Sequence, residues 1–237
     1  MADATRFLVI RLLVLGALLA AATSWAQKPH IVDQIAKTYG LDSFSQIDAI
    51  RYTFNAGATK TEISRGWVWE PKTGRVTYEG KDKAGKPVKV TYLRSQVGSE
   101  PANVKDEIDP EFINDQYWLL FPFHLVWDTD AKAEDTGMHK LPLGKGSATR
   151  VVVTYPAAAG GYQPGDLWEL FIGPDNRIRE WVYHRERLVT TWEDYRKAGP
   201  LLVALAHRGT RLGKPWRVVF TDVSVKLAGS DNWVNAQ

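Results

Sequence analysis

The clearest pattern in this chain is a set of short segments in which hydrophobic and polar residues alternate. Such segments cover residues 50–54, 63–69, 76–78 and 88–92, and further segments with strand signals cover residues 151–155, 167–172, 178–184, 188–195, 201–207 and 216–221. An alternation with a period of two residues is typical of half-buried antiparallel strands. Turn-forming residues at 70–74, 80–85 and 173–176 separate several of them and predict hairpins. The pattern therefore predicts about ten strands.

Two segments have helical spacing instead. Residues 29–39 place apolar side chains on one helical face, and Gly40 stands where helices commonly end. A second helix is expected to begin at Asp109-Pro110-Glu111, since Asp can cap, Pro fits the first helical position and Glu complements the helix N-terminus. We expect this helix to run to about Phe121, where Pro122 ends it. Residues 129–147 are polar and predict a loop.

The order of these elements predicts the architecture. Antiparallel sheets of about ten strands curl or close, and the two helices are available to cover an open side. We therefore expect a mainly β (α+β) fold: a strongly curved, incompletely closed antiparallel sheet whose concave side is covered by two helices. Such a shape creates a cavity by geometry alone. Because no linker or repeat is visible, residues 27–237 are expected to form a single half-barrel domain.

The first 26 residues have the three parts of a secretory signal. Arg6 and Arg11 precede an apolar run from Leu12 to Ala22, and Ser24-Trp25-Ala26 follows. This run is too short to cross a bilayer, which takes about 20 residues. We predict that residues 1–26 are a signal peptide cleaved after Ala26 and that the mature protein is soluble in the periplasm. The alternative is an uncleaved amphipathic or anchoring helix.

Composition narrows the possibilities further. The chain has 237 residues, of which 44% are hydrophobic, and it contains no Cys. This hydrophobic content excludes a disordered chain, and the absence of Cys excludes disulfides, thiol catalysis and a lipid anchor on cysteine. The 30 basic and 27 acidic residues are interspersed, whereas a nucleic-acid binder usually concentrates its positive charge. We expect no nucleic-acid partner.

Several apolar and aromatic segments suggest a family. They are Tyr39-Gly40-Leu41-Asp42, Tyr52-Thr53-Phe54-Asn55, residues 117–123 (YWLLFPF), 167–172 (LWELFI) with 176–178 (NRI), and 191–195 (TWEDY). From about Lys37 to Lys226 the chain resembles an uncharacterised group of exported bacterial proteins, which in turn resembles the periplasmic lipoprotein-carrier (LolA/LolB-like) fold.

That resemblance implies an unclosed barrel with a helical lid over a hydrophobic cavity, in which known carriers hold acyl chains and pass them to an outer-membrane receptor. The chain departs from the pattern in two respects. It lacks the Cys through which the receptor branch is lipid-anchored, and no position here matches the cavity arginine of the carriers.

Tryptophan is the most unusual feature of the composition, with ten residues in the chain. Large aromatic rings give an apolar ligand a broad contact area at low entropic cost. We predict that the ligand-binding cavity is lined by Trp67, Trp69, Tyr78, Trp118, Phe121, Trp168, Trp181 and Trp192. The alternative is an ordinary aromatic core. The strand register is open, because a shift of one residue decides whether Trp168 faces Trp181 or Val182.

Motifs for catalysis or metal binding are absent from the sequence. The five His residues have neither the i, i+4 nor the i, i+2 spacing of a metal pair, so we expect no metal and no cofactor. Glu169 and Glu180 lie on two strands of one predicted hairpin, and two carboxylates across a cleft can perform glycosidase chemistry. The alternative for this pair is two solvated positions on the outer face.

Three functions are consistent with these observations. The first is a non-enzymatic periplasmic carrier of a lipid, an acyl chain or another hydrophobic ligand, involved in outer-membrane lipoprotein or lipid trafficking and in transient contact with a membrane or envelope protein. The second is an exported hydrolase, which requires Glu169 and Glu180 to point into a cavity. The third is an envelope interaction module, which predicts a filled interior and a conspicuous apolar surface patch.

Overall fold

The structure is a computed structural model that describes residues 28–157 and 164–237. The predicted signal peptide, residues 1–26, lies outside the described residues. The α-helices are α1 (His30–Thr38) and α2 (Asp109–Trp127), with short helical turns at Leu41–Gln46, Arg94–Ser99 and Val104–Ile108. The strands are β1 (Ile47–Gly57), β2 (Ile63–Glu70), β3 (Arg75–Lys81), β4 (Pro87–Leu93), β5 (Lys132–Lys140), β6 (Ser147–Thr154), β7 (Leu167–Ile172), β8 (Ile178–Tyr183), β9 (Leu188–Thr191), β10 (Glu193–Ala198), β11 (Leu201–Arg211), β12 (Lys214–Leu227) and β13 (Trp233–Asn235).

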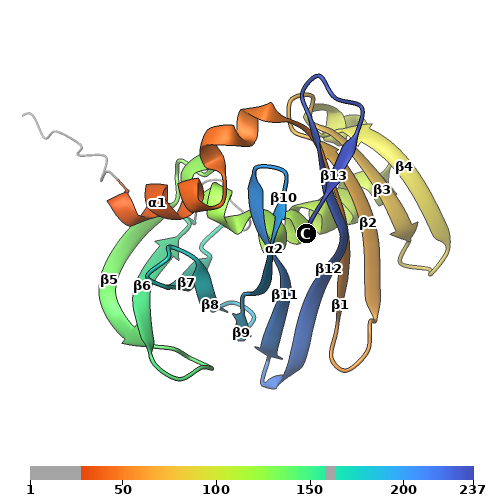
Figure 1. The fold of residues 1–237 in the computed structure, drawn as a ribbon. Helices are drawn as coiled ribbons and strands as arrows, with labels where there is room; N and C mark the ends of the chain where they lie inside the picture. The colour runs from red at the N-terminus through yellow and green to blue at the C-terminus, as the bar shows by residue number, and fades with distance from the viewer. Residues whose placement is uncertain (1–27, 158–163) are drawn as a thin grey trace, which may run out of the picture.

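All of these strands belong to one antiparallel sheet. Its order is β4-β3-β2-β1-β12-β11-β9-β8-β7-β6-β5, with β10 paired to β11 and β13 paired to β12. The strands β4 and β5 lie at the two ends of this order, so the sheet does not close into a barrel. Figure 1 shows the sheet curving from β4 to β5, with α2 crossing between its two halves. The predicted fold class is therefore confirmed.

Alternation along each strand separates an inner from an outer face. In β1, Ile50, Tyr52 and Phe54 are buried, whereas Arg51 and Thr53 between them are partly exposed. The buried set faces α2 and forms the concave side of the sheet, because successive side chains of a strand point to opposite faces. The hydrophobic effect thus places one aromatic face under the helices and leaves a polar face toward solvent.

The helix predicted at residues 29–39 is confirmed as α1, and Gly40 follows it with a φ of +106°. The predicted end of the second helix is wrong, because α2 continues through Pro122 to Trp127. The backbone of Leu120 is not helical (φ −115°, ψ 15°) and kinks α2. Pro122 therefore lies in the first turn after the kink, where its missing N–H has no helical acceptor to lose.

Two strand predictions also differ from the structure. Residues 129–147 were expected to be a loop, but β5 occupies Lys132–Lys140. This edge strand could not be recognised from the sequence, because its nine residues are mostly exposed and show no apolar alternation. The predicted strand 188–195 is split into β9 and β10 by a break at Trp192, and both parts pair along β11. The predicted hairpin at 173–176 is confirmed between β7 and β8.

Candidate functional site

The eight predicted cavity residues come together on the concave side of the sheet. Trp67 and Tyr78 lie on neighbouring strands with ring centroids 4.7 Å apart, and Phe112 of α2 packs 5.5 Å from Trp67. Seven of the eight are buried, and Trp69 is half-buried. Because they belong to both ends of the sheet and to α2, the fold gathers residues that are more than a hundred positions apart in sequence. We call this set the aromatic wall.

The second half of the aromatic wall surrounds Trp181. Its ring centroid lies 4.9 Å from Trp118, 4.7 Å from Trp168 and 5.1 Å from Trp192, while Phe121 is 5.3 Å away. Neither of the two partners considered for Trp168, Trp181 and Val182, is correct: Trp168 pairs with Tyr183, and Trp181 pairs with Leu170. The side chain of Trp181 is fully buried among rings from β7, α2 and the break before β10.

The aromatic wall is packed in this conformation. A void beside Trp118, Trp168 and Tyr183 measures about 10 Å³, which is at the lower limit for one water molecule. An acyl chain does not fit into this void unless the helix moves. Ligand binding by the eight residues stays a prediction.

A buried ionic cluster fastens the first half of α2 to β2. Arg65 donates to Asp115 from Nε at 2.7 Å and from Nη2 at 2.5 Å, and Trp67 Nε1 donates to the same carboxylate at 2.8 Å. Asn114 adds a fourth hydrogen bond, and Glu111 pairs with Arg65 from the solvent side. Burial raises the pKa of Asp115 to about 6, against the pull of Arg65. We call Arg65 and Asp115 the α2 latch.

The α2 latch was not predicted from the sequence, although the spacing of its residues contains a signal. Arg65, Trp67 and Trp69 are spaced by two residues and therefore share one face of β2. On α2, Asp115 lies three residues from Phe112 and from Trp118, which places it on the same helical face. One basic residue on the apolar face of β2 and one acidic residue on the apolar face of α2 are the pattern expected of a buried ion pair.

Aspartates also fix the two ends of α2. At its start, Asp109 accepts hydrogen bonds from Tyr92 Oη at 3.0 Å and Arg94 Nε at 2.9 Å. Beyond its last residue, Asp128 accepts from Tyr117 Oη at 2.5 Å and Tyr155 Oη at 2.8 Å. Burial acts to raise the pKa of Asp128, but hydrogen bonds from His124, Tyr117 and Tyr155 outweigh it and hold the pKa below its usual value.

His207 of β11 is the least satisfied polar side chain on the concave side. It is fully buried, and neither ring nitrogen has a hydrogen-bond partner. Burial lowers the pKa of its imidazole to about 3; the backbone of Thr191 is close enough to oppose this fall without making a well-formed hydrogen bond. Trp192 Nε1, on the neighbouring ring, is also buried without a partner. An unsatisfied buried group costs roughly 1–3 kcal/mol.

The carboxylate pair required for a hydrolase is not assembled. Glu169 pairs with Val182 and Glu180 with Phe171, so the two glutamates do not oppose each other. Both alternate with wall residues such as Trp168 and Trp181 and therefore lie on the outer face. Glu169 contacts Arg150 at 3.2 Å and His184 at 2.6 Å, and Glu180 accepts two backbone N–H groups of a loop. These partners leave neither carboxylate in a cleft with the other.

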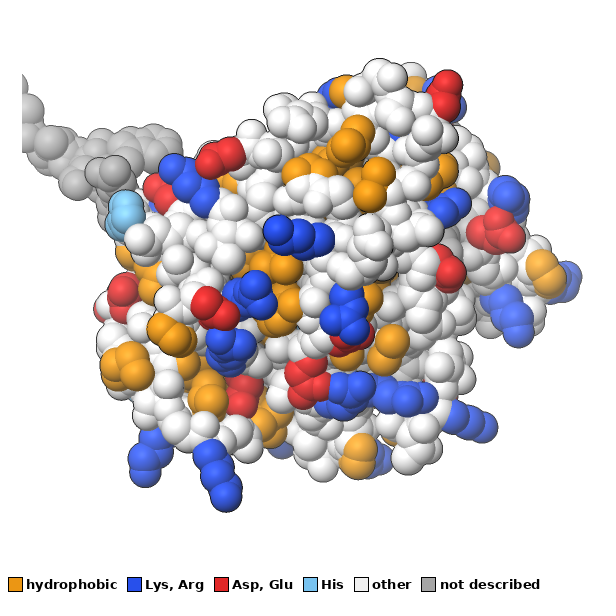
Figure 2. Space-filling model, in the orientation of Figure 1, with side chains coloured by type: hydrophobic (Ala, Val, Ile, Leu, Met, Phe, Trp, Pro, Cys, Tyr) orange, Lys and Arg blue, Asp and Glu red, His pale blue; other side chains and the backbone are white. Residues whose placement is uncertain are grey.

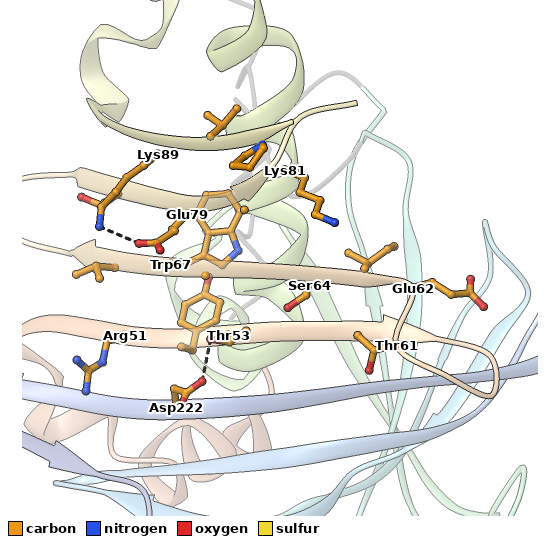
Figure 3. Close-up of a pocket in the computed structure, with 18 residues that line it drawn as sticks. Arg51, Thr53, Thr61, Glu62, Ser64, Trp67, Glu79, Lys81, Lys89 and Asp222 are labelled. Atoms are coloured by element: carbon orange, nitrogen blue, oxygen red, sulfur yellow. Dashed lines mark hydrogen bonds and ion pairs between the residues drawn. The ribbon is translucent and has the colours of Figure 1, made fainter. Parts of the chain in front are cut away.

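A shallow polar groove of about 1150 Å³ crosses the outer face of β1–β4 and β12. Figure 3 shows two polar contacts within the groove: Lys89 Nζ lies 2.8 Å from Glu79, and Thr53 Oγ1 donates to Asp222 at 3.1 Å. Arg51 stacks on Trp233 at its margin. The groove is open, its three basic and three acidic lining residues balance in charge, and Trp67 of the aromatic wall is among the residues that line it.

Among the described residues, no group of three or more His, Asp or Glu side chains is arranged to hold a metal ion. In the same part of the chain, no helix is both long enough and apolar enough to span a bilayer.

Comparisons with known proteins give weak matches only. No protein-family model matches the sequence, and neither does any curated protein. Among solved structures, the chain is similar to a DUF1329 family protein from Desulfovibrio piger (TM-score 0.43, 10% identity, covering 86% of this chain and 96% of that one). It is also similar to a putative outer membrane lipoprotein-sorting protein domain from Vibrio parahaemolyticus, with a TM-score of 0.42 and 11% identity over 84% of this chain and 94% of that one. A LolA superfamily protein from Nitrosomonas europaea matches with a TM-score of 0.43 and 10% identity over 82% of this chain and 93% of that one.

These neighbours are of the kind that the sequence resemblance named. At identities of 10–11% and TM-scores below 0.5, the likeness carries no information about ligand or activity.

Proposed function

We propose that this chain is an exported carrier that binds a lipid, an acyl chain or another hydrophobic ligand between the curved sheet and α2. The observation that carries the proposal is the way α2 is attached. Residues 115–125 of the helix are all buried, and the aromatic wall lies beneath them. Its polar attachments are concentrated at Asp109, Asp115 and Asp128. A helix held at a few points over an apolar surface suits a lid.

In this proposal the ligand enters as α2 moves away from the wall. The kink at Leu120 divides the helix into two parts, which gives the lid a place to bend. Opening exposes the rings of Trp118, Phe121 and Trp181 to water, and this is unfavourable by about 25 cal/mol per Å² of apolar surface. An acyl chain that covers the same rings restores this burial. The aromatic wall thus acts as a core when empty and as a binding surface when loaded.

The expected location and partners belong to the same proposal. Cleavage after Ala26 would release a soluble periplasmic protein, and a carrier there would exchange its ligand in transient contact with a membrane or an envelope protein. A role in outer-membrane lipoprotein or lipid trafficking is the corresponding process.

A second candidate is a non-catalytic envelope interaction module, which the packed interior favours. That function also predicts a conspicuous apolar surface patch. In the described part of the chain, the large hydrophobic side chains that are clearly exposed are Met138, Leu143 and Leu212. Figure 2 shows hydrophobic side chains in small groups among charged ones on the face it presents. The carrier therefore remains the preferred proposal.

The carrier is tested by purifying the mature protein from its host and analysing an organic extract by lipid mass spectrometry. Delipidated protein is then titrated with a fluorescent acyl ester. We expect saturable binding that Trp118→Ala and Trp181→Ala weaken. The control is Trp233→Phe, because Trp233 stacks on Arg51 on the outer side of the sheet. A lipid-free extract together with no binding of the acyl ester would contradict the proposal.

A further inference from the structure

His207 and Trp192 bury polar ring atoms within the aromatic wall that form no hydrogen bonds. The ring centroids of the two residues are 4.7 Å apart and nearly perpendicular, and Trp118 of α2 lies 5.3 Å from His207. His207 Nδ1 and Nε2 and Trp192 Nε1 are buried and have no hydrogen-bond partner. These three atoms therefore lie in one small region covered by a residue of the proposed lid.

Neighbouring indoles show that this is not the general condition of the wall. Trp181 Nε1 donates to Thr190 Oγ1 at 2.6 Å, and Trp67 Nε1 donates to Asp115 at 2.8 Å. Buried polar groups in proteins are almost always satisfied. A phenylalanine at position 207 would keep the ring packing and avoid an unsatisfied imidazole. The polar atoms of His207 and Trp192 are thus expected to find their partner in another state of the protein.

The available atoms define the chemistry of that partner. An indole N–H can only donate, and a neutral imidazole offers one donor and one acceptor. The ring contacts of His207 are with Trp118, Trp181, Trp192 and Phe220, and none of these residues carries a charge. A carboxylate or a phosphate would be buried here without a counter-charge, which is strongly unfavourable. An uncharged carbonyl fits, because it accepts hydrogen bonds and brings no charge.

We propose that His207 and Trp192 hydrogen-bond the ester or amide carbonyl at the head of an acyl chain once Trp118 moves aside. This inference rests on the proposed carrier function and names the class of its ligand. The hydrocarbon lies along the aromatic wall, while the carbonyl oxygen accepts from Trp192 Nε1 and from the N–H of His207. The site therefore selects acyl esters and acyl amides over free fatty acids and over plain hydrocarbons.

The test measures displacement of the apolar fluorophore N-phenyl-1-naphthylamine by three ligands of similar length: methyl myristate, myristate and pentadecane. In the unmodified protein we expect methyl myristate to bind about tenfold more tightly than pentadecane, since one hydrogen bond is worth up to about this factor. His207→Phe should weaken that preference, because only the hydrogen bond from Trp192 then remains, and should leave pentadecane binding unchanged. His184→Phe is the matched control, because His184 is exposed and contacts Glu169 on the outer face.

The outcomes separate the two proposals. If the fluorophore and all three ligands fail to bind the unmodified protein, the carrier function itself fails. If they bind but His207→Phe and Trp192→Phe keep the full preference for the ester, this inference is overturned. Circular dichroism checks that each variant folds. Should His207→Phe not fold, ¹⁵N NMR of the histidine rings decides: the ester must shift the His207 nitrogens of the unmodified protein, and pentadecane must not.

Discussion

The imidazole of His207 is held neutral by its surroundings, since burial lowers its pKa to about 3 from an ordinary value of 6.5. A histidine whose pKa is lower in the folded than in the unfolded protein stabilises the fold least in acid. Its contribution is fully present above pH 6.5 and is lost as the pH falls toward 3. At the residue scale, His207 thus makes the folded protein less stable as the pH falls below 6.5.

We predict that His207→Phe makes the protein less sensitive to acid. The free energy of unfolding of the unmodified protein should fall relative to that of the variant between pH 6.5 and 3, by up to about 1.4 kcal/mol per pH unit. Urea denaturation at several pH values measures this difference. Asp115, whose pKa is raised, acts in the opposite direction in both proteins and cancels. Parallel curves for the two proteins would show that His207 is not held neutral by burial.

Glu180 carries the second prediction at this scale. Its two carboxylate oxygens accept from the backbone N–H groups of Leu143 and Gly144, each at 2.7 Å, and so hold the loop after β5 on the outer face. Glu180→Gln replaces one acceptor with a donor, so we expect a loss of about 1–2 kcal/mol and faster hydrogen exchange at these two amides. Glu193→Gln is the control, because Glu193 forms an exposed ion pair with Arg208. Unchanged exchange at Leu143 and Gly144 would refute this role for Glu180.

Which residues of a strand share a face of the sheet can be predicted from the sequence, but their neighbours from distant segments cannot. The alternation of polar and apolar positions places Trp67 and Trp69 on one face without any structure. The neighbours of His207 come instead from α2, from β8, from the break before β10 and from β12, and no local pattern shows that these segments meet. The same holds for the outward position of Glu169 and Glu180, which depends on the register of β7 and β8.

At the scale of elements, we predict that breaking the α2 latch strongly destabilises the protein. Asp115→Leu leaves the guanidinium of Arg65 buried beside an apolar side chain, and breaking a buried pair in this way costs roughly 3–5 kcal/mol. The double variant Arg65→Met with Asp115→Leu should recover much of that loss, because it removes both charges. Thermal and urea unfolding provide the measurement.

The matched control for the α2 latch is Lys89→Ala, which breaks an exposed ion pair with Glu79. An exposed pair contributes at most about 1 kcal/mol. Equal losses for Lys89→Ala and Asp115→Leu would mean that the latch does not hold α2 to the sheet.

A substitution at Gly209 tests the pairing between β11 and β9. It lies opposite Thr190, and a Cβ atom there would come within 1.9 Å of the carbonyl oxygen of Val189. Gly209→Ala must therefore push β9 away, and we expect a loss of about 2–3 kcal/mol. Gly98→Ala, where a Cβ atom meets nothing within 4 Å, should cost little. Similar melting temperatures for the two variants would contradict this pairing.

Most elements are predictable because their signals are local. The alternation in β2 to β4 and the turn residues at 70–74 and 80–85 are sufficient to predict the β2–β3 and β3–β4 hairpins. The misses have physical causes: β5 is an edge strand without an apolar face, and Pro122 is tolerated because the kink at Leu120 places it in a new first turn. The break at Trp192 is set by pairing along β11, which no local pattern encodes.

At the scale of the whole molecule, the curved open sheet is predictable and the state of its interior is not. Strand count alone requires a sheet of this size to curl, and two helices are sufficient to cover the concave side. Whether that side is hollow depends on the summed volumes and rotamers of side chains from segments far apart in sequence. Here Trp118, Phe121 and Trp181 fill it, so a cavity must be created by movement of α2.

The central claim is that α2 is a lid over a hydrophobic binding surface. Its most direct test is hydrogen exchange of delipidated protein, followed by mass spectrometry, with and without a saturating fatty acyl ester. The account predicts that the ester changes amide exchange in α2 and in the strands under it, β7 and β8, and leaves the outer-face loop at residues 141–146 unchanged. Identical exchange in α2 with and without the ester would contradict it.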